Sequence, residues 1–129
     1  MIFYLTAGTT HTPTTFNDLW KFDLNTHEWS RCMAGGQYPA PKALASMVQY
    51  KDNLVYFGGW AHPPPYPIMQ PWRIFDELHM YNVTTNRWTH VVTTSTPFPC
   101  AGHSASVHGD QMVVFGGRTF NKTEEAYPL

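Results

Sequence analysis

The feature that most constrains this 129-residue sequence is that it repeats itself. Moved by 58 positions, residues 39–59 coincide with residues 97–117 at nine of 21 positions, ending in Gly58-Gly59 over Gly116-Gly117. At an offset of 59, FNDL at 16–19 lies over FDEL at 75–78. Repeats of this length indicate a fold built from copies of one supersecondary unit.

One period contains four short segments that are compatible with β-strands, at residues 44–50, 54–57, 78–83 and 88–92. The wholly apolar run at 54–57 is typical of a strand buried on both faces. Polar residues at 51–53 and 84–86 mark tight turns, and no segment has helical periodicity. We therefore expect an all-β chain of four-stranded antiparallel units. The second glycine of each pair is expected to have a positive φ or to allow close backbone approach.

Composition supports this fold class and excludes several functions. Aromatic residues make up 16% and charged residues only 13% of the chain, which argues against disorder. The net charge of -1 provides no basic field for nucleic acid or anionic membranes, and no apolar run is long enough to span a bilayer. Two cysteines without CxxC spacing indicate reduced thiols of an intracellular protein, so we expect a cytoplasmic or nuclear location.

The repeated residues resemble the kelch repeat, which implies a β-propeller. An apolar strand closed by Gly-Gly is followed by an aromatic residue and, seven positions later, by Trp. The sequence departs from the kelch pattern at Ala7-Gly8, at Leu44-Ala45 and at Cys100. The resemblance assigns structural kelch roles to nine positions. These are Gly58, Gly59, Gly116, Gly117, Tyr81, Trp88, Phe22, Trp29 and His103.

A narrower resemblance covers most of the chain. The strings FNDLWKFDLN, GGQYPAPKA, YKDNLVYFGGW, HPPPYPIMQP and FDELHMY are similar to the kelch region of the F-box only protein 42 family. That family is a substrate receptor of Skp1–cullin–F-box ubiquitin ligases. The resemblance implies that this propeller binds the protein substrate, and that an F-box outside this chain recruits Skp1 and the cullin.

The length predicts a partial ring, because propellers typically contain 4 to 8 blades. We expect residues 1–42 to form strands two to four of one blade and a connecting loop. Residues 43–95 are expected to form a complete blade, and residues 96–129 the first two strands of a third blade and a tail. The chain then holds about two blades' worth of an unclosed propeller, as a piece of a larger one, and its uncovered edges make it prone to aggregate.

The expected binding site is the face that collects the long connections. Successive connections of a meander alternate between its two ends, so the long connections 9–16, 30–42, 60–75 and 93–102 share one end. The proline-rich connection 60–75 carries residue types enriched at protein interfaces. We expect partner binding by Trp60, His62, Tyr66, Trp72, Arg73 and Arg118.

Other functions are less well supported by the sequence. Residues 63–66 match a PPxY ligand of WW domains, a short pattern that is common by chance. The seven histidines show no metal-ligand spacing, and no nucleophile or phosphate-binding motif is present, so we expect no metal, no cofactor and no catalytic residue. The alternatives are a generic kelch scaffold that binds cytoskeletal or regulatory proteins, and part of a propeller enzyme.

Overall fold

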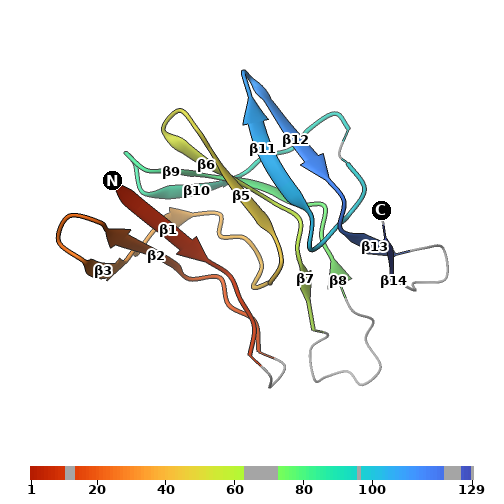
Figure 1. The fold of residues 1–129 in the computed structure, drawn as a ribbon, viewed down its shortest axis with the longest axis horizontal. Helices are drawn as coiled ribbons and strands as arrows, with labels where there is room; N and C mark the ends of the chain where they lie inside the picture. The colour runs from red at the N-terminus through yellow and green to blue at the C-terminus, as the bar shows by residue number, and fades with distance from the viewer. Residues whose placement is uncertain (11–13, 63–72, 96, 121–125, 129) are drawn as a thin grey trace.

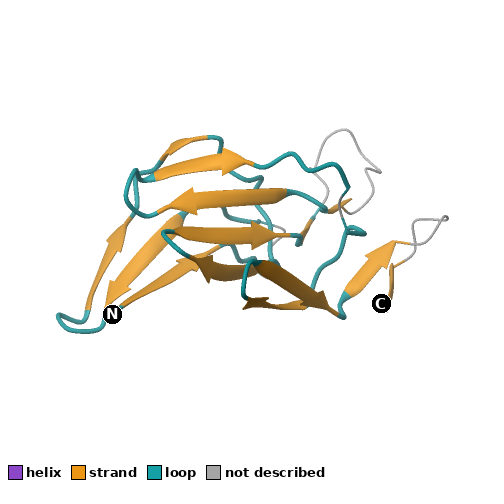
Figure 2. Ribbon diagram, turned by 90° about the horizontal axis from the view of Figure 1, so that it is seen from above, coloured by secondary structure: helices purple, strands orange, loops and turns teal. Residues whose placement is uncertain are grey.

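The structure, a computed structural model, describes residues 1–129 except 11–13, 63–72, 96, 121–125 and 129. The described residues form strands and loops without a helix (Figure 2). The strands are β1 (Ile2–Thr6), β2 (Leu19–Asp23), β3 (Glu28–Arg31), β4 (Gly35–Gly36), β5 (Ser46–Tyr50), β6 (Asn53–Phe57), β7 (Trp60–Ala61), β8 (Arg73–Ile74), β9 (Leu78–Asn82), β10 (Arg87–His90), β11 (Ser104–His108), β12 (Gln111–Phe115), β13 (Arg118–Phe120) and β14 (Ala126–Pro128).

The middle of the chain forms the predicted four-stranded unit, which we call the central blade: β5, β6, β9 and β10. Its strands pair antiparallel in the order β10-β9-β6-β5. The N-terminal sheet, β1-β2-β3, and the C-terminal hairpin, β11-β12, lie on either side of it (Figure 1). The all-β class, the antiparallel meander and the unclosed arrangement are therefore confirmed.

The turns repeat down to individual hydrogen bonds. The Asn82 side-chain oxygen accepts hydrogen bonds from the backbone N–H groups of Thr84 and Thr85. Asp23 does the same for Asn25 and Thr26 in the N-terminal sheet. Side chains of this type favour tight turns because they bind the backbone two residues further on. This bonding explains why β9–β10 and β2–β3 are joined so closely.

The two residues that follow β1, β6 and β12 have left-handed φ values in all three units, although only two of the units carry Gly-Gly there. Gly59 and Gly117 have φ values of 102° and 90°, as predicted for the second glycine of each pair. The first glycines, Gly58 and Gly116, are also left-handed, with φ values of 76° and 75°. Ala7 takes the same place in the N-terminal unit with φ 69°, so the motif's geometry persists where its sequence departs from Gly-Gly.

The two faces of the central blade pack against different neighbours. Leu54 and Tyr56 belong to a buried cluster that also contains Leu19 of the N-terminal sheet and Cys32, which follows β3. Phe57 points the other way, and its ring centroid lies 5.5 Å from that of His103, which leads into β11. This alternation follows from the strand period of two. The core therefore consists of interfaces between neighbouring sheets.

The two outer sheets each leave one face uncovered by the described residues. Phe115 is 79% exposed, whereas Phe57, its equivalent in the central blade, is 2% exposed. Phe3 and Leu5 of β1 are exposed as well, although their equivalents Leu54 and Tyr56 are buried. The exposed apolar faces occur where the repeat would place a further blade.

The structure adds three short strand pairings that the sequence analysis treated as loop or tail. β7 pairs with β8 at the base of the 60–75 connection, and β13 pairs with β14 after the next Gly-Gly pair. Gly35–Gly36 pairs parallel with β10, which gives the central blade a fifth strand. Each pairing involves only two or three residues per strand, which is too short to produce a detectable period.

Candidate functional site

The described ends of the 60–75 and 93–102 connections lie at one end of the sheets, which we call the long-loop face. The 30–42 connection instead runs along β10 and reaches this end only near Lys42. In Figure 1, β7, β8 and the start of β11 lie at the lower end, while the β5–β6 and β11–β12 turns lie at the upper end. This arrangement follows from the antiparallel order of the central blade and the hairpin. Loops carried on a rigid scaffold are the usual carriers of recognition.

The base of the 60–75 connection is fixed by backbone hydrogen bonds from three parts of the chain. Trp60 and Ala43 exchange N–H···O bonds of 2.9 Å in both directions. Gly59 donates to the Cys100 carbonyl at 2.8 Å, and Phe75 donates to the Gly59 carbonyl at 2.8 Å. A Cβ on Gly59 would lie 2.9 Å from the Ala43 carbonyl oxygen, so this close approach requires glycine. The connection thus leaves the sheet from a well-ordered base.

Four of the predicted partner-binding residues are described, and three of them, Trp60, His62 and Arg73, lie at this base. Trp60 is half-buried, and the His62 ring meets it edge-on with centroids 4.7 Å apart. Arg73 is exposed, and its guanidinium carbon lies 4.5 Å from the Phe75 ring centroid. Tyr66 and Trp72 lie outside the described residues, as does the PPxY segment.

Arg118 occupies the position in its unit that Trp60 occupies in the central blade. Arg118 and Ala101 exchange backbone hydrogen bonds of 2.8 and 3.0 Å, matching the pairing of Trp60 with Ala43. Arg118 is exposed. Equivalent backbone pairing places Arg118 at the same end of its sheet as Trp60.

The residues with expected structural kelch roles differ in burial. Tyr81 and Trp88 are buried, with ring centroids 5.3 Å apart. The equivalent rings Phe22 and Trp29 are 4.9 Å apart, but Trp29 is 52% exposed. The difference arises because β3 is an outer strand, whereas Trp88 is covered by the segment containing β4.

His103 connects the hairpin to the central blade. Its Nε2 lies 2.8 Å from the Ser46 hydroxyl oxygen, within hydrogen-bond distance. Burial lowers the pKa of His103, with the nearby Lys42 charge acting in the same direction and a backbone hydrogen bond opposing them. A neutral imidazole at this position suits a hydrogen bond to a hydroxyl and agrees with a structural role.

Sequence reasoning missed a buried charged cluster beneath the long-loop face. The Lys42 side chain is 0% exposed, and its Nζ lies 3.6 Å from the Glu77 carboxylate oxygen Oε2. The same ammonium group lies 4.6 Å from the centroid of the Tyr56 ring and 5.1 Å from that of Phe75. His79 completes the cluster, with Nδ1 3.8 Å from Glu77 Oε2. One signal was available: Lys42 aligns with Cys100, the position that is usually basic in kelch.

Burial dominates the electrostatics of this cluster. It lowers the pKa of Lys42 to about 8, although the Glu77 carboxylate partly opposes the shift. It also lowers the pKa of His79 to about 4, again against the influence of Glu77. At neutral pH, Lys42 is therefore a buried cation and His79 is neutral. The distances to Glu77 exceed those of direct hydrogen bonds, so the cluster is held by charge and by aromatic contact.

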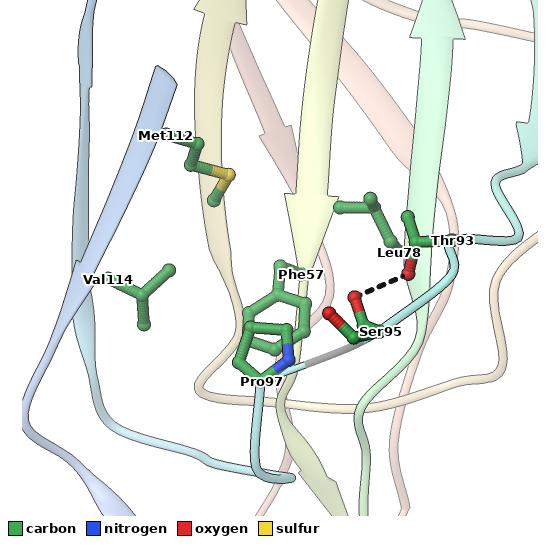
Figure 3. A pocket seen from close by; sticks show the side chains of 7 residues that line it. All are labelled: Phe57, Leu78, Thr93, Ser95, Pro97, Met112 and Val114. Carbon is green, nitrogen blue, oxygen red and sulfur yellow. Dashed lines mark hydrogen bonds between the residues drawn. The ribbon is translucent and has the colours of Figure 1, made fainter.

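An apolar cavity of about 160 Å³ lies between the central blade and the C-terminal hairpin. Figure 3 shows Phe57, Met112 and Val114 around it. The polar lining residues Thr93 and Ser95 are bonded to each other, the Thr93 hydroxyl donating to the Ser95 carbonyl at 3.0 Å. The cavity offers apolar contact and no charged group.

The described parts of the chain contain no group of three or more His, Cys, Asp or Glu side chains arranged to hold a metal ion. They also contain no helix with the length and hydropathy needed to cross a membrane.

Comparisons with known proteins agree with the fold. The chain is 31% identical over 114 residues to human host cell factor 2, covering 79% of this chain and 14% of that protein. It is 29% identical over 130 residues to mouse kelch domain-containing protein 3, covering 96% of this chain and 32% of that protein. The chain therefore spans about a third or less of the length of these relatives.

A solved structure titled "Structure of YjhT" matches with a TM-score of 0.61 and 25% identity, covering 82% of this chain and 28% of that one. The sequence family described as "FBX42, beta-propeller domain" matches residues 1–127, almost the whole chain. The fold, the kelch positions and this match lead to one conclusion: the chain belongs to the FBX42 beta-propeller domain family.

Proposed function

We propose that this chain is a protein-binding module that engages its partner through the long-loop face. The observation that carries the proposal is the placement of Trp60 and Arg118 at equivalent positions of adjacent units. Arg73 lies across the β7–β8 ladder from Ala61, next to Trp60. Tryptophan and arginine are enriched among the residues that dominate binding energy at interfaces. Because their backbones are already ordered, little entropy is lost when a partner docks.

The more specific proposal is that the module selects protein substrates for a Skp1–cullin–F-box ubiquitin ligase. Its support is membership of the FBX42 beta-propeller domain family and the resemblance of residues 16–81 to the F-box only protein 42 family. In this proposal the chain binds substrate and catalyses nothing, while an F-box elsewhere in the protein recruits Skp1. The protein then acts in the cytoplasm or the nucleus, where such ligases work.

The test compares partner capture by the full-length protein and its variants. We expect Arg73→Ala with Arg118→Ala to reduce recovery of bound substrate at least tenfold, because both exposed guanidinium groups are lost from the long-loop face. Arg87→Ala is the matched control, since Arg87 is an exposed arginine at the start of β10, beside the tight turn at the opposite end of the central blade. Quantitative mass spectrometry of the purified complexes provides the measurement.

The two levels of the proposal have separate readouts. Equal loss of substrate recovery with the double variant and with Arg87→Ala would refute the long-loop face as the binding site. Capture of substrate without Skp1 and a cullin would refute the ligase role and favour a kelch scaffold. Recovery of Skp1 and a cullin with both variants is expected, because neither variant touches an F-box.

A further inference from the structure

The Arg73 side chain rests on an aromatic ring at the base of the 60–75 connection. Its guanidinium carbon lies over the Phe75 ring, 4.5 Å from the centroid, although the arginine itself is exposed. Within the described residues, no hydrogen bond or ion pair engages this guanidinium group. The contact with the ring is therefore the interaction that holds the side chain.

The backbone fixes both residues of this contact. Arg73 pairs with Ala61 across the β7–β8 ladder. Phe75 donates a hydrogen bond to the Gly59 carbonyl at 2.8 Å, and its own carbonyl accepts the N–H of Cys100 at 3.2 Å. Residues two apart in an extended segment point to the same side, so the local backbone directs the Arg73 side chain toward the Phe75 ring.

The Phe75 ring is a fixed support rather than a mobile one. It is 3% exposed, and the buried Lys42 ammonium group lies 5.1 Å from its centroid. Burial, and to a smaller degree the Arg73 charge, lowers the pKa of Lys42, so the two cations are close enough to interact. The same ring thus contacts a buried cation and an exposed one.

The N-terminal unit has the same backbone arrangement without the arginine. Phe16 corresponds to Phe75 in the repeat, and its N–H and carbonyl make the equivalent hydrogen bonds, both of 3.2 Å. Thr14 stands where the central blade has Arg73. An arginine on the ring is therefore a feature of the central blade and not a requirement of the repeat.

The contact with the ring bears on how Arg73 can bind a partner. An arginine side chain without support has many rotamers, and ordering it in a complex costs free energy. A guanidinium group that lies over an aromatic face loses part of this freedom before the partner arrives. Its N–H groups stay available for hydrogen bonds to the partner, because the described residues use none of them.

We propose that Phe75 is a positioning residue of the long-loop face, whose ring holds the Arg73 guanidinium group in one orientation before the partner binds. This inference rests on the proposed function, because there the partner contacts Arg73. Phe75 is buried and acts on the partner only through the arginine.

The first measurement concerns the full-length protein without a partner. With isotope-labelled arginine, we expect NMR relaxation to give the Arg73 Nε–Hε group an order parameter above about 0.6. Phe75→Leu keeps an apolar side chain but removes the ring, and is expected to lower the order parameter below that value. Phe57→Leu is the matched control, because Phe57 is 2% exposed in the same blade and its ring contacts His103 instead. This control is expected to leave the order of Arg73 unchanged.

The second measurement is the recovery of bound substrate in a double-mutant cycle. Phe75→Leu is expected to lower recovery about fivefold, the cost of ordering a free arginine on binding, whereas Phe57→Leu leaves recovery unchanged. Added to Arg73→Ala, Phe75→Leu is expected to cause no further loss, because the ring acts only through the arginine. Arg73→Lys keeps the charge but removes the planar group, and is expected to lower recovery as much as Phe75→Leu.

Three outcomes overturn the proposal. The first is an Arg73 order parameter that Phe75→Leu does not change. The second is an equal loss of substrate recovery with Phe75→Leu and Phe57→Leu, which indicates general destabilisation. The third is a further loss of recovery when Phe75→Leu is added to Arg73→Ala. Unchanged recovery with Arg73→Ala, together with a mobile Arg73 in Phe75→Leu, would instead overturn the proposed contact of Arg73 with the partner and uphold its positioning by Phe75.

Discussion

At the scale of single residues, the Gly-Gly pairs combine two separate constraints. Gly58 and Gly116 have nearly the same φ, 76° and 75°, so the backbone requirement is equal at the two positions. Their surroundings differ. A Cβ on Gly58 would lie 2.5 Å from His103 Cε1 and 2.6 Å from the Cys100 carbonyl oxygen, whereas a Cβ on Gly116 meets no described atom within 4 Å. The sequence predicts a positive φ or close backbone approach for the second glycine of each pair. The structure shows that the first glycine is also left-handed and that Gly58 allows contact between units.

This pair of glycines allows a matched measurement. We expect Gly116→Ala to lower the free energy of unfolding by about 1 kcal/mol, the strain of a left-handed alanine. Gly58→Ala carries the same strain and a steric clash, so we expect a further loss of about 1–3 kcal/mol. Urea denaturation of the two variants provides the comparison. Equal losses would show that the surroundings of Gly58 accommodate a Cβ without cost, which would contradict the expected clash with the His103 segment.

At the scale of elements, the Lys42 cluster joins the 30–42 connection to β9. Lys42 ends that connection, Glu77 immediately precedes β9, and His79 is the second residue of β9. Of the adjacent carboxylates Asp76 and Glu77, the first is exposed and the second is half-buried. The cluster itself was not predicted, because Lys42 is far from Glu77 in the sequence and a lysine is ordinarily expected at an exposed position.

The cluster predicts a dependence of stability on pH. The pKa of His79 is about 4 in the folded protein, against 6.5 for an unperturbed histidine, so the folded state resists protonation. The contribution of neutral His79 to the free energy of unfolding is fully present above pH 6.5. It is lost as the pH falls from 6.5 toward 4. We expect His79→Gln to reduce the loss of unfolding free energy between about pH 7 and pH 4.5 by about 1–3 kcal/mol. Urea titrations at the two pH values measure it, and parallel losses in both proteins would contradict the assignment.

The same comparison has an internal control in His90. His90 is exposed, and its ring centroid lies 4.9 Å from that of His79. His90→Gln removes a neighbouring imidazole without removing the buried one. The free energy of unfolding of the His90→Gln variant is therefore expected to fall between about pH 7 and pH 4.5 nearly as much as that of the unmodified chain.

At the scale of the whole molecule, the repeat predicted most of the architecture and little of its irregular parts. Periodicity and turn residues predicted three things: the order of β5, β6, β9 and β10, the turns between these strands, and the end of the sheet that carries the long connections. The β4 pairing was not, because two glycines carry no side chains from which burial can be inferred. The interior of the 60–75 connection, with Tyr66 and Trp72, lies outside the described residues, and its role stays a prediction.

The uncovered faces predict how the isolated chain behaves in solution. Phe115 is 79% exposed on the flat face of the hairpin, and we expect Phe115→Lys to raise the protein concentration at which aggregation begins at least twofold. Val92→Lys is the control, because this substitution adds the same charge at a residue that is 84% exposed but lies outside the described strands. Light scattering over a concentration series measures the onset. An equal shift for both variants would assign the effect to charge alone.

The β4 pairing has a consequence for how such proteins can be recombined. Gly35 and Gln37 donate backbone hydrogen bonds to Asn86 and Trp88 at 3.0 and 2.9 Å, so the 30–42 connection covers the outer edge of the central blade. A gene segment cut at residue 43 would leave that cover behind with its neighbour. The portable module for grafting or duplication therefore starts near residue 33, ahead of the first strand that the blade shows in sequence.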